Sequence, residues 1–165
     1  MSSKPILPRV GLGYDVHQLV EGVPFWLGGI LLDHPFGAKG HSDADVLIHA
    51  LCDALLGAAN LRDIGYHFSD KDAQYKGIDS KILLKRVVDM LTERGYAIGN
   101  VDCMLMLEAP KINPHIQTMQ TTLANVMGID ADCVSIKATT SEKLGFVGRR
   151  EGVEAQAVAL IYKAI

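Results

Sequence analysis

Three residues of metal-binding type stand at spacings that would bring them to one ion. Asp15 and His17 lie two apart in a segment whose alternation predicts a strand, so both side chains leave the same face. On a predicted helix, Asp45, His49 and Asp53 follow at intervals of four and form a polar stripe. Two imidazoles and one carboxylate suit a catalytic Zn²⁺ or another divalent metal that keeps a position open. We expect Asp45 and Asp53 to hydrogen-bond the imidazoles and fix their tautomers.

A simpler interpretation of the same residues stays open at this point. A D-x-H pair occurs by chance in many sequences, so Asp15 and His17 alone are weak evidence. His49 could be an ordinary core histidine whose ring nitrogens are satisfied. The acidic stripe beside His49 favours the metal.

Two segments have the residue types that bind phosphate. His41 and Ser42 directly precede the predicted helix, whose free N–H groups and dipole favour an anion. The alternative, which these two residues taken alone favour, is that Ser42 is an N-cap with Asp45 at N3. In the polar segment 137–143, Glu142 offers the oxygen ligand that Mg²⁺ or Mn²⁺ prefers. A solvated turn explains that segment equally well.

A third candidate, Asp63 with Gly65, is weaker evidence. A carboxylate in a loop can accept hydrogen bonds from ribose hydroxyls, as acidic residues do in other nucleotide sites. Turns use the same residue types for backbone reasons.

The composition limits the class of protein. The chain has 165 residues, of which 48% are hydrophobic and 21% charged, so we expect one globular domain over residues 1–165. Its net charge of −3 and the absence of a basic run argue against nucleic acid as a partner. Three widely spaced cysteines indicate reduced thiols in the cytoplasm, and no segment resembles a signal peptide or a membrane span.

Periodicity predicts an α+β fold. The N-terminal strands, over residues 9–18 and 24–32, are expected to form a hairpin around Glu21-Gly22. An irregular, functional loop is expected over 62–78. The other predicted elements are helices from Ser42 to about Asn60, over 79–94 and over 114–128, and strands over 101–107, 134–138 and 153–162. We expect a mixed four-stranded sheet with the three main helices on one face.

The last predicted strand is apolar on both faces. Its alternate positions from Val153 to Ile161 are apolar, and the positions between them include Val158, Leu160 and Tyr162. Because helices are expected to cover only one face, the other face is expected to be buried in a cyclic homo-oligomer.

Five segments together resemble one known family. They are GYDVH at 13–17, GHSDADVLIHALCDALLGAA at 40–59, RDIGYHFSD at 62–70, EAPKINPHI at 108–116 and KATTSEKLGFVGRREG at 137–152. In this order, and over nearly the whole chain, they resemble the 2-C-methyl-D-erythritol 2,4-cyclodiphosphate synthases. The resemblance implies a lyase of the non-mevalonate route to isoprenoid precursors. Such an enzyme cyclises 4-diphosphocytidyl-2-C-methyl-D-erythritol 2-phosphate by attack of its 2-phosphate on the β-phosphate and releases CMP.

The resemblance also implies a homotrimer with active sites at the subunit interfaces, the sheets lining its interior. Asp15, His17 and His49 would hold Zn²⁺ or another divalent metal, and Glu142 would hold Mg²⁺ or Mn²⁺. His41 and Thr140 would be the catalytic residues that stabilise the transition state. The implied substrate-binding set is Asp15, His17, His41, Ser42, Asp63, Ile64, Gly65, Phe68, Asp70, Asp72, Leu107, Ala109, Lys111, Ile112, Asn113, Thr139, Thr140, Ser141, Glu142, Phe146 and Arg149.

Within that set, Asp63 and Gly65 would bind ribose, and residues 107–113 with Thr139 and Thr140 would frame the cytosine from the neighbouring subunit. The segment 68–72 would line the methylerythritol phosphate end with Phe146 and Arg149.

Three positions depart from the family pattern: Ala44 and Arg150 stand where Gly occurs, and Ser141 where Thr is frequent. Arg149 and Arg150 together would place positive charge near the threefold axis, where an isoprenoid diphosphate in a central cavity is a further expected ligand. The expected location is the bacterial cytoplasm, with a plastid-type mature form as the alternative.

Two other functions fit the same residues. A metal-dependent hydrolase would use metal-bound water in place of the internal phosphate and would give a linear product. A non-catalytic sensor would bind isoprenoid diphosphates and release no CMP.

Overall fold

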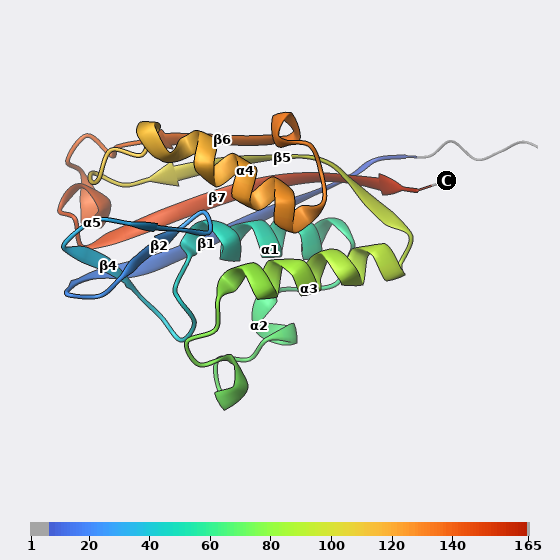
Figure 1. Cartoon of the computed structure of the whole chain (residues 1–165), viewed down its shortest axis with the longest axis horizontal. Helices are drawn as coiled ribbons and strands as arrows, with labels where there is room; N and C mark the ends of the chain where they lie inside the picture. The colour runs from blue at the N-terminus through green and yellow to red at the C-terminus, as the bar shows by residue number, and fades with distance from the viewer. Residues whose placement is uncertain (1–6, 165) are drawn as a thin grey trace, which may run out of the picture.

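The computed structural model describes residues 7–164, which form a mixed sheet covered by helices on one face (Figure 1). The five strands of the sheet lie in the order β4-β1-β7-β5-β6, and only β5 and β6 are parallel neighbours. These strands are β1 (Arg9–Glu21), β4 (Phe36–Lys39), β5 (Tyr96–Met106), β6 (Val134–Thr139) and β7 (Gly152–Lys163). A separate two-stranded sheet pairs β2 (Phe25–Leu27) with β3 (Ile30–Leu32).

Three long helices form the covering layer. They are α1 (Val46–Ala58), α3 (Ser80–Glu93) and α4 (Ile116–Met127), and Figure 1 shows them on the same side of the sheet. Short helices α2 (Ile64–His67) and α5 (Gly145–Gly148) and three 3₁₀ turns, η1 (Ala73–Tyr75), η2 (Asn113–His115) and η3 (Ala131–Cys133), lie in the connections. Within residues 7–164, no helix has the length and apolar character needed to cross a membrane. The α+β class and the single helical layer are confirmed.

The structure corrects four details of the sequence-based prediction. The expected hairpin is wrong, because β1 pairs with β4 and β7 while β2 pairs with β3. The sheet has five strands, since the short β4 joins its edge. Ser42 is not the N-cap of α1, because Asp45 accepts a hydrogen bond from the Ile48 N–H and the helix begins at Val46. The loop over 62–78 contains α2 and the turn η1.

Two glycines explain why α1 lies directly on β1. A Cβ atom at Gly11 would lie 1.9 Å from the Ala54 carbonyl oxygen, and one at Gly13 would lie 1.8 Å from that of Ala50. Only glycine permits so close an approach of helix and strand backbones. This packing brings His49 on α1 over the middle of β1, where Asp15 and His17 lie.

The face of the sheet away from the helices is apolar and exposed. On β1, Val10 is 64% exposed and Leu12 is 69% exposed, and Val158 of β7 lies directly opposite Leu12. Tyr14 interrupts this surface by donating a 2.6 Å hydrogen bond to Glu154. A contiguous apolar sheet face of this kind is typical of an interaction surface.

Candidate active site

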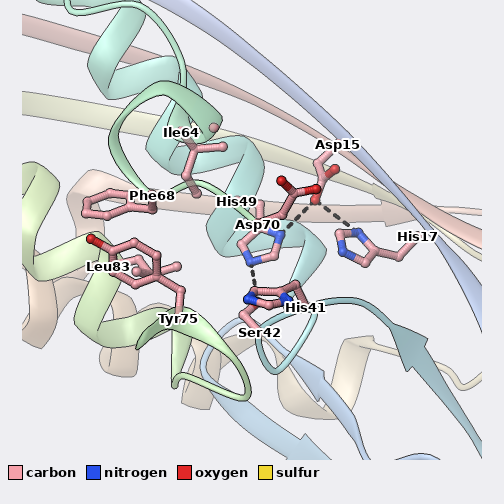
Figure 2. Close-up of a pocket in the computed structure, with 11 residues that line it drawn as sticks. Asp15, His17, His41, Ser42, His49, Ile64, Phe68, Asp70, Tyr75 and Leu83 are labelled. Carbon is pink, nitrogen blue, oxygen red and sulfur yellow. Dashed lines mark hydrogen bonds and ion pairs between the residues drawn. The ribbon is translucent and has the colours of Figure 1, made fainter. Parts of the chain in front are cut away.

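The structure brings the three predicted metal ligands together (Figure 2). Asp15 Oδ2 lies 3.0 Å from Nδ1 of His17 and 3.0 Å from Nδ1 of His49. The ligand atoms of all three residues lie within 4.8 Å of one another. One face of β1 supplies Asp15 and His17, as the strand period of two predicts, and α1 supplies His49 from above.

This group fits a divalent metal on its own geometry and chemistry. His17 Nδ1 is a buried atom without a hydrogen-bond partner among the described residues, although it faces Asp15. Such an atom is costly to bury unless a ligand satisfies it. Three oxygen and nitrogen donors that converge from two elements therefore form a site that could hold a metal ion.

The charges within the group favour a carboxylate that faces imidazoles. Burial raises the pKa of Asp15, but the two imidazoles lower it by more, so that its pKa falls to about 2. Burial acts to lower the pKa of His49, and the Asp15 carboxylate outweighs it, so that the pKa is raised. The metal-free protein therefore keeps a negative charge where a cation would bind.

Asp45 and Asp53 do not contact the imidazoles, which corrects their predicted role. The carboxylate of Asp45 is fully buried and accepts hydrogen bonds from the N–H groups of Gly28, Gly29 and Ile48. Asp53 accepts one from the Ile64 N–H at 2.7 Å. Both carboxylates are therefore hydrogen-bonded to free backbone N–H groups at helix starts and in adjacent turns.

A cavity of about 440 Å³ opens beside the metal group. Most of the residues around it belong to the predicted set. The lining residues are Asp15, His17, His41, Ser42, His49, Ile64, Gly65, Phe68, Asp70, Tyr75 and Leu83. Figure 2 shows Phe68, Tyr75 and Leu83 on the side opposite Asp15 and His17. Tyr75 and Leu83 were missed, because no sequence motif marks them.

A second hollow of about 220 Å³ lies between the chain that follows β5 and the end of β6. It shares no lining residue with the metal cavity. Its lining residues are Leu107, Glu108, Pro110, Lys111, Ile112, Asn113, Ala138, Thr139 and Thr140. The predicted residues from the two segments therefore meet, but at a place separate from the metal group.

Thr140 and Glu142 lie on an exposed turn beside this hollow. Glu142 adopts a left-handed conformation with φ of 52°, and Lys143 has φ of 64°. Thr140 Oγ1 donates a long, 3.5 Å hydrogen bond to Glu142. Glu108 holds the turn, since its carboxylate accepts from the N–H groups of Ser141 and Lys143. Sequence reasoning placed Glu108 only within the segment 107–113 expected to frame the cytosine and did not predict that it holds this turn.

Comparison with known proteins identifies the family. The sequence matches the model of the YgbB family over residues 8–162. The chain belongs to this family. It is 65% identical over 153 residues to the 2-C-methyl-D-erythritol 2,4-cyclodiphosphate synthase of Bacteroides fragilis, covering 93% of this chain and 96% of that protein. The synthase of Cytophaga hutchinsonii is 64% identical over 94% of this chain and 98% of its own.

A solved structure supports the same assignment. The CDP complex of IspF from Plasmodium falciparum has a TM-score of 0.84 and 30% identity, covering 96% of this chain and 97% of that one. The resemblance stated from the sequence motifs is confirmed.

The remaining predicted residues of this YgbB-family chain line neither of the two hollows. Asp63 caps α2 through the Tyr66 N–H, and Asp72 caps a 3₁₀ turn while its carbonyl oxygen lies 3.2 Å from His41 Nε2. Ala109 and Arg149 line a third cavity of about 350 Å³, with Arg150, Leu19 and the residues 34–36. Phe146 packs against Gly152 at the start of β7.

Two departures from the family pattern fall on unusual backbone. Ala44 and Arg150 both have φ of 60°, in the left-handed region that favours glycine. Both residues therefore accept a conformational cost that glycine would avoid.

Proposed function

We propose that the chain converts 4-diphosphocytidyl-2-C-methyl-D-erythritol 2-phosphate into 2-C-methyl-D-erythritol 2,4-cyclodiphosphate and CMP. The observation that carries the proposal is the converging group of Asp15, His17 and His49 beside a cavity, in a member of this family. The reaction needs no strong base, because the attacking 2-phosphate is already an anion. Positioning and neutralisation of charge supply the catalysis, as in phosphoryl transfer generally.

The metal group would hold Zn²⁺ through one carboxylate oxygen and two Nδ1 atoms. A bound zinc ion would orient and polarise a diphosphate oxygen as a Lewis acid. Asp15 and His17 come from a strand and His49 from a packed helix, so the three ligands would hold this end of the substrate with little motion. The cavity wall of Phe68, Tyr75 and Leu83 would exclude water from the methylerythritol end.

Glu142 would hold Mg²⁺ or Mn²⁺, which would neutralise negative charge on the diphosphate. His41 and Thr140 would donate hydrogen bonds where negative charge accumulates during attack. His41 lies in the metal cavity, whereas Thr140 lies at the second hollow. Both groups would act on one diphosphate only if the two hollows meet.

A homotrimer would bring them together. Each active site would combine the metal cavity of one chain with the second hollow of its neighbour. The exposed apolar face of β1 and β7 supplies a surface for this assembly. Leu107–Asn113 and Thr139 would then frame the cytosine, and Asp63 with Gly65 would bind the ribose of the same nucleotide. The homologous IspF structure with CDP supports a cytidine ligand.

An isoprenoid diphosphate in the central cavity of the trimer is the further ligand we propose. Arg149 is exposed and pairs with Glu151 through two hydrogen bonds of 3.0 Å. A ring of such pairs would present guanidinium groups to a diphosphate. An Arg149→Ala variant should lose stabilisation by added isoprenoid diphosphate, and unchanged stabilisation would contradict this ligand. We propose the bacterial cytoplasm as the location, on the basis of three free cysteines and bacterial relatives.

The reaction is tested by phosphorus NMR of the purified protein with the diphosphocytidyl substrate and Mg²⁺. Cyclic diphosphate plus CMP is the expected product. A linear phosphorylated product would instead establish a hydrolase, and no release of CMP would establish a binding protein.

A further inference from the structure

A buried hydroxyl group lies against the ring nitrogen of His49 that faces away from Asp15. Ser80 is the first residue of α3, its side chain is fully buried, and its Oγ lies 3.0 Å from His49 Nε2. Ser80 and Asp45 are the polar residues that the described chain buries completely. A completely buried hydroxyl is almost always hydrogen-bonded, so the partners of Ser80 can be identified from the structure.

The partners of Ser80 determine the direction of its hydrogen bond to His49. Ser80 donates twice to the Asp43 carboxylate, with its hydroxyl to Oδ1 and with its N–H to Oδ2 at 2.9 Å. Because a hydroxyl has one proton, the Ser80 oxygen can only accept from His49. Nε2 must then carry a proton, so in the neutral ring the lone pair lies on Nδ1, which faces Asp15.

Ser42 alone would not determine which ring nitrogen of His49 carries the proton. Its Oγ also lies 3.0 Å from His49 Nε2, as Figure 2 shows, and it accepts from the Ala44 N–H at 3.1 Å. The Ser42 hydroxyl proton can rotate towards or away from the ring, so either tautomer would be satisfied. The Ser80 hydroxyl lacks this freedom, because its proton is donated to the Asp43 carboxylate.

We propose that Ser80, held by Asp43, is a positioning residue that presents Nδ1 of His49 to the metal. Asp43 is itself held, because its N–H donates to the Ile78 carbonyl at 3.0 Å. Next to it, the Gly77 N–H donates to the His41 carbonyl at 2.7 Å. The start of α3 is thereby joined to the loop that precedes α1. This inference rests on the proposed metal site.

The test is zinc affinity, measured with Zn²⁺ alone by competition with a coloured chelator. Ser80→Ala should weaken zinc binding about 10–100-fold, as loss of a group that orients a metal-bound imidazole does. Asp79→Ala is the matched control, because Asp79 caps the same helix through the Lys81 N–H at 2.8 Å and does not touch His49. It should lower Tm but leave zinc affinity unchanged. In the Co²⁺-loaded protein, only Ser80→Ala should alter the visible absorption bands.

A second variant keeps the test decisive if Ser80→Ala folds poorly. Asp43→Asn keeps the shape but replaces one acceptor oxygen by a donor, so it should weaken zinc binding in the same direction. The double variant should bind about as well as the weaker single variant, because both changes break one chain of contacts. Wild-type zinc affinity in Ser80→Ala and Asp43→Asn would overturn the positioning role alone. A wild-type protein that binds no zinc would overturn the metal site as well.

Discussion

The two halves of the proposed active site differ in how they are held. In the metal half, Asp15, His17 and His49 converge within one chain, and both imidazole side chains are only 13% exposed. In the nucleotide half, Thr140 and Glu142 lie on an exposed turn and contact each other through hydrogen bonds of 3.3 and 3.5 Å. Packing of α1 on β1 therefore builds the metal half within one chain, whereas we propose that a ligand or a neighbouring chain completes the nucleotide half.

The largest expected effect comes from removing a metal ligand. His49→Ala should reduce bound zinc from about one ion per chain to none and lower turnover by about 10³-fold, since the metal supplies several kcal/mol of charge stabilisation. Metal analysis and CMP release measure the two effects. His34→Ala is the control, because its ring hydrogen-bonds with the Phe36 backbone, lies near two aromatic rings and does not line the metal cavity. Wild-type zinc content in His49→Ala would contradict the ligand assignment.

The next effect would separate the two halves. Leu12→Asp places a charge on the exposed sheet face, so it should convert the proposed trimer to monomers and lower turnover at least about 100-fold, because a buried unpaired charge costs several kcal/mol. Zinc binding should persist. Light scattering and metal analysis measure this. Ile82→Asp, on the exposed surface of α3, is the control and should remain trimeric. A fully active Leu12→Asp monomer would show that one chain holds the whole site.

A smaller effect is expected in the nucleotide half. Glu142→Gln keeps the shape of the side chain but removes its charge, so it should leave zinc content unchanged and lower turnover about 10–100-fold, an effect that extra Mg²⁺ partly reverses. Glu93→Gln, at the far end of α3, is the control. Loss of zinc in Glu142→Gln would place Glu142 in the metal half instead.

The smallest effect concerns pH. The folded pKa of metal-free His49 is raised, so its stabilising contribution is complete below the unfolded value of about 6.5 and is lost as pH rises through the folded value. Zinc must displace that proton, which is worth about 1.4 kcal/mol per pH unit, so the increase in Tm caused by zinc should grow between pH 6 and 8 by about 3–5 °C per pH unit. Thermal scans at fixed free zinc, with chelator as control, measure this. A constant increase would show that no proton is released.

The sequence predicted the metal half better than the contacts that support it. The strand period of two predicts that Asp15 and His17 share one face of β1. Their closeness to His49 results from Gly11 and Gly13, which let α1 pack directly on β1. The assignment of Asp45 failed, because a carboxylate at a helix start meets backbone N–H groups before it meets an imidazole. The hydrogen bonds of Ser80 to His49 and of Glu108 to Ser141 could not be predicted, since each joins residues more than 30 positions apart in the sequence.

The N-terminal pairing failed for a related reason. The turn at Glu21-Gly22 is present, but the strand that returns beside β1 is the short, weakly patterned β4. The segment with the stronger apolar pattern, 24–32, folds on itself as β2 and β3. The local sequence pattern predicted where the strands lie, but tertiary packing determines which strands pair.

The shared active site is tested most directly by mixing two inactive chains. His49→Ala removes the metal half and Thr140→Val removes a hydroxyl from the nucleotide half, so each homotrimer should be inactive. When equal amounts of the two chains are mixed at random, roughly a quarter of wild-type activity should return in the whole population of trimers, because each site has one chance in two of receiving each intact half. No return of activity in verified mixed trimers would show that both halves act within one chain, contradicting the shared site.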